Sequence, residues 1–177
     1  MIKAAIVGLG WWGRHIVGSL AGSDKLQITR GVEPRLDVLR LLPAGAKFPV
    51  TSNLDNALRD DDIDAIVLAT PHSTHEKQIV RSAQAGKHVF AEKPVAVDGP
   101  GIRSVLASCQ LAKKKKLSVV SGLCLRFSNG FQELVRRLHD GAIGDLHTLQ
   151  ANDYRGSIWF KERQPGWTDM HYQMRNW

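Results

Sequence analysis

Short apolar runs alternate with longer segments of helical hydrophobic spacing over roughly the first 120 residues of the chain. The apolar runs cover residues 4–7, 26–32, 48–51, 64–70, 88–91 and 117–125. The segments between these runs have the hydrophobic spacing of helices, and we predict helices over residues 15–20, 35–42, 53–58, 75–85 and 98–115. The run at 64–70 is apolar on both faces, as in a fully buried strand. This alternation predicts an α/β fold, with a doubly wound parallel sheet covered by helices on both faces.

The pattern changes after the sixth apolar run. Residues 129–139 have helical spacing between Ser128, a capping residue, and Gly141, which would end the helix. Residues 146–154 alternate between polar and apolar positions, as a strand does. We therefore expect a first domain over residues 1–122 and the incomplete beginning of a second domain over residues 123–177.

The first apolar run leads directly into a Gly-x-Gly-x-x-Gly motif formed by Gly8, Gly10 and Gly13. We expect Gly8 to allow the tight turn after the strand, and Gly10 to let the backbone approach phosphate groups. Gly13 would let the following helix pack against the strand. The positive end of that helix would then face an anion. The motif predicts a site for a dinucleotide pyrophosphate, although the same residues could form a purely structural turn.

An acidic residue, Glu33, follows Gly13 by 20 residues, at the end of the second apolar run. A carboxylate at this place can accept hydrogen bonds from the adenosine ribose hydroxyls and repels a 2′-phosphate. Glu33 therefore favours NAD. Arg35 could instead hold a 2′-phosphate, so NADP remains an alternative, and Glu33 could also be a solvated surface residue.

Four segments follow strands and should share one edge of the sheet, where ligands bind in open parallel sheets. They cover residues 8–13, 33–35, 70–75 and 92–94. Lys93 at the last of them would point into the cleft, where its ammonium group could donate to a substrate hydroxyl or assist proton transfer. The alternative is a surface lysine that only pairs with Glu92. Likewise, His75 could simply cap or pack a helix.

Composition narrows the class of protein. The 177 residues are 43% hydrophobic and 23% charged, which is typical of a globular protein. The longest apolar runs are far below the ~20 residues of a membrane span, and no signal peptide fits before the first strand. Cys109 and Cys124 lie in apolar contexts without metal-ligand spacing. We therefore expect buried free thiols in a cytoplasmic protein.

The chain is basic, with 24 Lys and Arg against 17 Asp and Glu and a net charge of +7. The positive residues are mostly dispersed, and the one block, residues 113–116, falls where a helix should end. We expect this charge to attract anionic cofactors and substrates rather than nucleic acid. His72 and His75 have no Cys or Asp at ligand spacing, so no metal site is expected.

Together these residues resemble the glucose–fructose oxidoreductase, inositol dehydrogenase and rhizopine catabolism (Gfo/Idh/MocA) family. The matching stretches cover residues 5–13, 69–75, 91–94 and 122–127, and Glu92-Lys93-Pro94 is the most specific of them. The resemblance implies a Rossmann-type domain followed by an α/β domain with a mostly antiparallel sheet. It also implies an NAD(P)-dependent dehydrogenase that transfers a hydride between the nicotinamide and a sugar, inositol or related polyol.

The resemblance assigns roles to individual residues. Lys93 would be the catalytic lysine and would contact the substrate, as would Arg126, and the Lys93–Pro94 peptide bond would be cis. The positions expected to hold the cofactor are Gly8, Leu9, Gly10, Trp11, Trp12, Gly13, Glu33, Arg35, Thr70, Pro71, His72, His75, Glu92 and Pro94.

One family feature does not match. A second motif, Asp-x-x-x-His, supplies a catalytic histidine in the family, whereas Asp169-Met170-His171 has the wrong spacing. We therefore expect this chain to be a truncated form or fragment that lacks most of the substrate domain and binds cofactor with little or no turnover. An NAD-dependent glycosidase of the same family and a non-catalytic dinucleotide-binding protein are the alternatives. An open sheet edge and apolar surface around residues 146–160 would favour a homo-oligomer.

Overall fold

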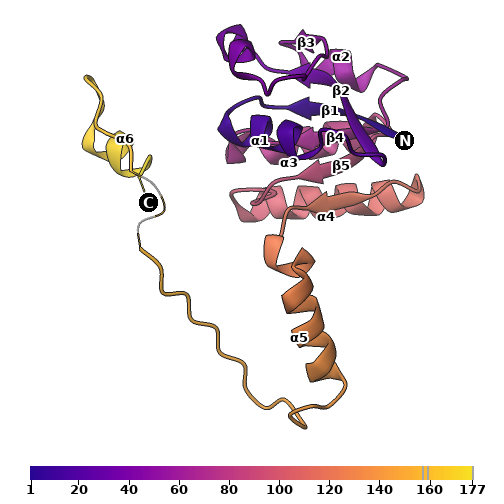
Figure 1. Ribbon diagram of the computed structural model, residues 1–177, viewed down its shortest axis with the longest axis vertical. Helices are drawn as coiled ribbons and strands as arrows, with labels where there is room; N and C mark the ends of the chain where they lie inside the picture. Colours follow the sequence, from indigo (N-terminus) through magenta and orange to yellow (C-terminus); the bar gives the residue numbers. More distant parts are fainter. Residues whose placement is uncertain (157, 159, 177) are drawn as a thin grey trace. The chain divides into compact units, whose positions relative to one another are not determined.

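The computed structural model describes residues 1–156, 158 and 160–176, and within them six parallel strands form one sheet (Figure 1). The strands are β1 (Ile2–Val7), β2 (Leu26–Val32), β3 (Val50–Thr51), β4 (Ala65–Leu68), β5 (His88–Ala91) and β6 (Val119–Ser121). Their order is β3-β2-β1-β4-β5-β6, and every neighbouring pair is parallel. This confirms the predicted doubly wound sheet. The strand order reverses between β1 and β4, where such sheets bind ligands.

Helices connect the strands and cover both faces of the sheet. They are α1 (Trp11–Ser19), η1 (Leu36–Leu41), α2 (Leu54–Leu58), α3 (His72–Gln84), α4 (Gly99–Lys114) and η2 (Cys124–Phe127). Successive residues of β1 point to opposite faces. Ala4 and Ile6 pack with Val17 of α1, whereas Ala5 and Val7 pack on the side of α2, α3 and α4. Both faces are therefore apolar and buried, as the sequence pattern predicted.

Two helices of the first unit, α2 and α4, begin at side-chain caps. The Asn53 side chain accepts a hydrogen bond from the backbone N–H of Asp55 at 2.9 Å, and Asp98 accepts one from Gly101 at 2.7 Å. Each cap satisfies one of the N–H groups that a helix leaves unpaired at its start.

Some predicted boundaries are wrong. The helix expected to begin at His75 begins at His72, because Pro71 takes the N-cap position and its carbonyl accepts a bond from Thr74 N at 2.9 Å. The segment 35–42 forms a short 3-10 helix rather than an α-helix. The sixth strand ends at Ser121, since its pairing with β5 ends there. Cys124 follows in η2 and is exposed rather than buried, although both cysteines are free.

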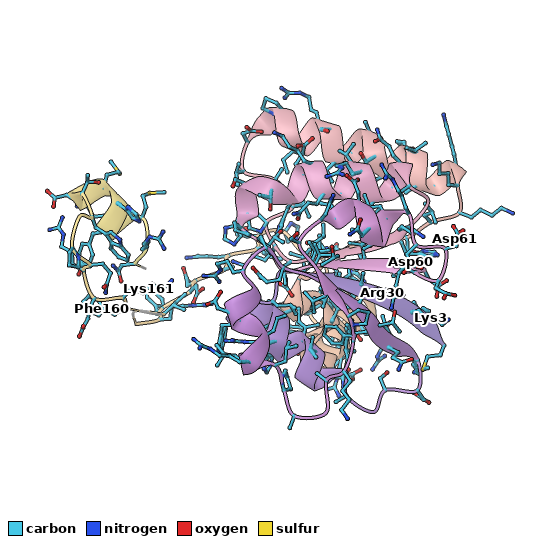
Figure 2. The ribbon with its side chains drawn as sticks, turned by 90° about the horizontal axis from the view of Figure 1, so that it is seen from above. Lys3, Arg30, Asp60, Asp61, Phe160 and Lys161 are labelled. Carbon is cyan, nitrogen blue, oxygen red and sulfur yellow. The ribbon has the colours of Figure 1, made fainter. Side chains whose placement is uncertain are left out.

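The loop before β4 is anchored on the side of the sheet opposite the strand ends that carry the glycine motif. Arg30 Nε donates to Asp60 Oδ2 at 3.0 Å, and Lys3 pairs with Asp62 at 3.3 Å. Figure 2 shows Lys3, Arg30 and Asp60 at this end of the molecule. The buried Lys87 donates to the carbonyl oxygens of Asp60 and Ile63, each at 2.8 Å. These contacts fix the start of the central strand β4.

The chain divides into two units, Met1–Ser128 and Asn129–Trp177. The second contains α5 (Asn129–His139) and α6 (Asp169–Gln173). On α5, hydrogen bonds from Arg136 and Arg137 lower the pKa of the exposed Glu133.

The strand predicted over 146–154 is absent: residues 146–156 of the described chain form neither helix nor strand. A strand needs a partner for its backbone groups, and no described strand pairs with this segment. Residues 157 and 159, within the apolar stretch predicted over 146–160, lie outside the described residues.

Candidate functional site

At two of the three motif positions in the turn between β1 and α1, glycine is the only residue that fits. Gly8 has φ +92°, and a Cβ there would lie 2.5 Å from the carbonyl oxygen of Ala69. A Cβ on Gly13 would lie 1.9 Å from the carbonyl oxygen of Gly8. Both distances are far below contact distance, so the first turn of α1 packs directly on the end of β1.

Gly10 differs from the other two. It is the N-cap of α1, and a Cβ built on it meets no described atom within 4 Å. The open space at Gly10 belongs to a cleft, and the first turn of α1 contains no acidic residue. Glycine at this position is therefore not needed to avoid a clash. It leaves the backbone at the start of α1 accessible to a ligand, as binding of a pyrophosphate requires.

Glu33 connects the glycine turn to the loop after β2. Its side chain is buried, with 5% of the residue exposed. One carboxylate oxygen accepts a hydrogen bond from Leu9 N at 2.9 Å, and the other accepts one from Arg35 N at 3.0 Å. The exposed guanidinium of Arg35 lies 3.8 Å from the same carboxylate. Each oxygen retains lone-pair capacity for a further donor, so the group can still receive a ribose hydroxyl.

A cleft of about 720 Å³ lies at the carboxyl ends of β1, β2 and β4, beside the point where the strand order reverses. Eight of the expected cofactor residues line it, namely Gly8, Gly10, Trp11, Trp12, Glu33, Arg35, Thr70 and Pro71. The volume falls within the range of small-molecule and cofactor sites. The glycine positions, the exposed helix start and the acidic group at the far wall fit a dinucleotide.

Trp11 and Trp12 form an aromatic group at the mouth of the cleft. Their ring centroids lie 5.4 Å apart, and the ring of His15 stacks on Trp12 at 5.0 Å. Trp11 is 74% exposed. The two indoles are tilted by 38° with respect to each other and present apolar ring surface beside the glycine turn.

The segment after β4 forms a hydrogen-bonded wall of the cleft. Thr70 Oγ1 donates to Gln78 Oε1 at 2.6 Å, and Thr74 Oγ1 lies 2.7 Å from the carbonyl oxygen of Pro71. Thr74 and Gln78 also line the cleft. Sequence reasoning named neither as a cofactor residue, although Thr74 falls within the predicted segment 70–75. The spacing of 74 and 78 places both on one side of a helix that begins at His72. The fully buried His75 lies behind this wall.

Lys93 lies outside the cleft lining, exposed in the loop after β5. The Lys93–Pro94 peptide bond is cis, as expected. Burial lowers the pKa of His72, and the charges of His75 and Lys93 lower it further. His72 directly follows Pro71, which lines the cleft.

Glu92 and Arg126 do not line the cleft. A Cβ on Gly122 would lie 2.9 Å from a Glu92 carboxylate oxygen, so Glu92 packs against the backbone after β6. Arg126 lies in η2, exposed and outside the cleft lining. The structure thus brings residues expected to hold phosphate and ribose, Gly10 and Glu33 among them, into one cleft, whereas Lys93 and Arg126 lie outside its lining.

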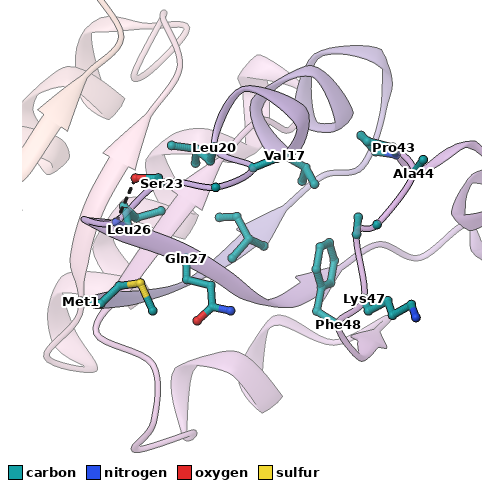
Figure 3. A pocket seen from close by; sticks show the side chains of 15 residues that line it. Met1, Val17, Leu20, Ser23, Leu26, Gln27, Pro43, Ala44, Lys47 and Phe48 are labelled. Carbon is teal, nitrogen blue, oxygen red and sulfur yellow. Dashed lines mark hydrogen bonds between the residues drawn. The ribbon is translucent and has the colours of Figure 1, made fainter.

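A second cavity of about 360 Å³ lies at the opposite end of β2, between the end of α1 and residues 43–48 (Figure 3). Val17, Leu20 and Phe48 give it a largely apolar lining. None of the expected site residues lines it, and it is not at the carboxyl ends of the strands. The cleft at the glycine turn is therefore the candidate site.

The described residues contain no cluster of three or more His, Cys, Asp or Glu side chains that could hold a metal ion. In the part of the chain that the structure covers, no helix combines the length and apolar character needed to cross a bilayer.

Comparison with known proteins agrees with the geometry of the cleft. The sequence model of a family described as oxidoreductases with an NAD-binding Rossmann fold (Gfo/Idh/MocA) matches residues 2–123. Inositol 2-dehydrogenase of Rhizobium meliloti is 36% identical over 154 residues, which are 86% of this chain and 46% of that protein. The 2,7-anhydro-N-acetylneuraminate hydratase of Escherichia coli is 26% identical over 98% of this chain and 45% of its own length.

A solved structure is similar as well. The scyllo-inositol dehydrogenase of Lactobacillus casei, with bound NAD(H) and scyllo-inositol, superposes with a TM-score of 0.71 at 27% identity. The match covers 82% of this chain and 43% of that one. The chain therefore spans less than half the length of these relatives.

Proposed function

The chain belongs to the Gfo/Idh/MocA oxidoreductase family, and we propose that it binds a nicotinamide dinucleotide in the cleft between the glycine turn and Thr70. We further propose that the full product of its gene transfers a hydride between that coenzyme and a sugar, inositol or related polyol. The observation that carries the proposal is the cleft itself. Gly10 opens it to phosphate, and Glu33 closes its far side with a carboxylate suited to ribose.

A bound nicotinamide supplies the hydride acceptor or donor, and the residues of this chain hold and orient it. The backbone at Gly10 and the start of α1 would receive the pyrophosphate, while Gly8 and Gly13 allow the tight turn that presents them. Thr70 and Pro71 form the wall beside the rest of the coenzyme. The exposed Lys93 side chain would orient a substrate hydroxyl by a hydrogen bond and assist the transfer of its proton. Arg126 is proposed as a further substrate contact.

Glu33 supports a preference for NAD over NADP. A buried carboxylate repels a 2′-phosphate, and its two backbone hydrogen bonds keep it in place. Arg35 is the group that would favour NADP, because its guanidinium is exposed beside the same loop. The 3.8 Å contact leaves Arg35 only loosely paired with Glu33.

A second candidate follows from the relative named as a hydratase, which matches 98% of this chain. A hydratase adds or removes water and leaves the overall oxidation state of its substrate unchanged. In this alternative, the coenzyme would be held without net production of its reduced form.

Two measurements test the proposal. Titration of this chain with NAD and with NADP in a calorimeter should give saturable binding that is tighter for NAD; no binding of either coenzyme would contradict the site. The full gene product is then mixed with NAD and scyllo-inositol, myo-inositol or simple sugars. Appearance of reduced nicotinamide absorbance supports the dehydrogenase. Conversion of an anhydro sugar without that absorbance change supports the hydratase.

A further inference from the structure

The buried imidazole of His75 connects two loops of the candidate site. His75 as a whole is fully buried. Nδ1 lies 2.8 Å from the carbonyl oxygen of Pro94, and Nε2 lies 2.9 Å from the carbonyl oxygen of Thr70. Pro94 follows Lys93 in the loop after β5, whereas Thr70 lies on the cleft wall after β4. One rigid ring therefore spans the distance between the cleft wall and the lysine loop.

A lysine side chain is long and flexible, so the location of its ammonium group is only as well defined as the backbone that carries it. Pro94 has no N–H group, which leaves its carbonyl oxygen as its only main-chain hydrogen-bonding group. The contact with His75 uses that oxygen.

We propose that His75 is a positioning residue for Lys93, which holds the Lys93 loop against the cleft wall by donating a hydrogen bond from Nδ1 to the Pro94 carbonyl. What Lys93 then does rests on the proposed function, but the contact belongs to the free chain. Carbonyl oxygens only accept hydrogen bonds, so the contact with Pro94 requires a hydrogen on Nδ1. The contact with Thr70 is a hydrogen bond as well only when Nε2 also carries a hydrogen.

Two matched variants separate the two ends of the ring. In His75→Asn, the side-chain amide takes the place of Nδ1 and can still donate to Pro94. In His75→Gln, the longer side chain takes the place of Nε2 and can donate only to Thr70. Both variants remove the ring and keep one amide donor, so a general loss of packing affects them alike.

The readout is the NMR signal of Lys93 in the free chain after isotope-labelled dimethylation of its lysines, assigned with Lys93→Arg. We expect this signal to keep its wild-type position in His75→Asn and to be displaced in His75→Gln. The signal of Lys47, at the opposite end of β2, should stay unchanged in both. An unchanged Lys93 signal in both variants, or equal displacement in both, overturns the proposal.

A measurement on the wild-type chain keeps the proposal decidable if the variants do not fold. Long-range nitrogen–proton NMR of the His75 ring should show a hydrogen on Nδ1, and a bare Nδ1 overturns the proposal. Coenzyme titration is scored separately. If the wild-type chain binds neither NAD nor NADP, the proposed function fails while the measurements on the free chain still decide the role of His75.

Discussion

The carboxylate of Glu33 accepts a hydrogen bond from the backbone N–H of Leu9 at 2.9 Å, across 24 positions of sequence. Leu9 is fully buried and lies between two motif glycines. Glu33, which is expected to bind the ribose, therefore also holds in place the glycine turn that is expected to bind the phosphates. Stability and coenzyme preference should change together when Glu33 is replaced.

Replacing Glu33 with alanine should lower both the free energy of unfolding and the preference for NAD over NADP. The buried Leu9 N–H loses its acceptor, which costs about 1–3 kcal/mol of unfolding free energy. The preference for NAD over NADP should also narrow, because the repulsion of a 2′-phosphate disappears. Denaturant unfolding and calorimetry with both coenzymes check this. Glu33→Gln is the control, since it keeps one acceptor and should cost less stability; an equal loss in both variants would contradict the hydrogen-bond argument.

Gly10→Ala and Gly13→Ala form a second matched pair. A methyl group at Gly13 would lie 1.9 Å from backbone at Gly8, so overpacking should cost about 3 kcal/mol or more. A methyl group at Gly10 meets no described atom, and its φ of −61° suits alanine. Gly10→Ala should therefore keep wild-type stability and lose about tenfold or more in coenzyme affinity. Full affinity in Gly10→Ala would place the phosphates elsewhere.

Sequence reasoning succeeded where a pattern depends on neighbours along the chain. β4 was recognisable because apolar residues occupy both of its faces, and the Gly8-to-Gly13 spacing reflects the geometry of a single turn. The strand predicted over 146–154 is wrong because alternation shows only that a segment could pair. It does not show that a partner exists.

Contacts between separate loops were not recognisable in the same way. Nothing in the spacing of Glu33 indicates that its carboxylate binds the Leu9 backbone, because that bond depends on how two loops meet. His75 was expected to hold cofactor, or to cap or pack a helix, and it lies buried in α3. The spacing did not indicate its contacts with the carbonyl oxygens of Thr70 and Pro94, which lie 5 and 19 positions away.

The apolar side chains of the second unit lead to a prediction about assembly. Leu149 is 83% exposed and Phe160 is 70% exposed, and neither lies in a helix or strand. Exposed apolar surface favours association, so this chain should form dimers or larger species in solution. Light scattering at several concentrations measures this, and Leu149→Glu with Phe160→Glu should reduce the apparent mass. A stable monomer at all concentrations would contradict the prediction.

Lys93→Met should separate catalysis from coenzyme binding. Lys93 is exposed and lies outside the cleft lining, so its replacement should change the unfolding free energy by less than about 0.5 kcal/mol. Coenzyme affinity of the chain should stay near the wild-type value. Turnover by the full gene product should be lost, because the proposed proton-transfer group is gone. Unimpaired turnover in Lys93→Met would assign that step to another residue.

The lowered pKa of His72 gives a prediction about pH. Burial disfavours the charged imidazole, and the nearby charges of His75 and Lys93 disfavour it further. The folded chain therefore binds this proton less readily than the unfolded chain does. The contribution of His72 to stability is present above the unfolded pKa of about 6.5 and is lost as the pH falls through the lower folded value.

Lys93→Met removes one of the two charges that lower the pKa of His72, so this pKa should rise. An NMR titration that follows the imidazole proton signals of His72 measures the change. Lys47→Met is the matched control and should leave this pKa unchanged, because Lys47 lies at the other cavity. His72→Gln should reduce the loss of unfolding free energy between neutral and mildly acidic pH. An equal response of His72 to both lysine substitutions would show that Lys93 is not near the cleft wall, and the proposed position of the catalytic amine would then be wrong.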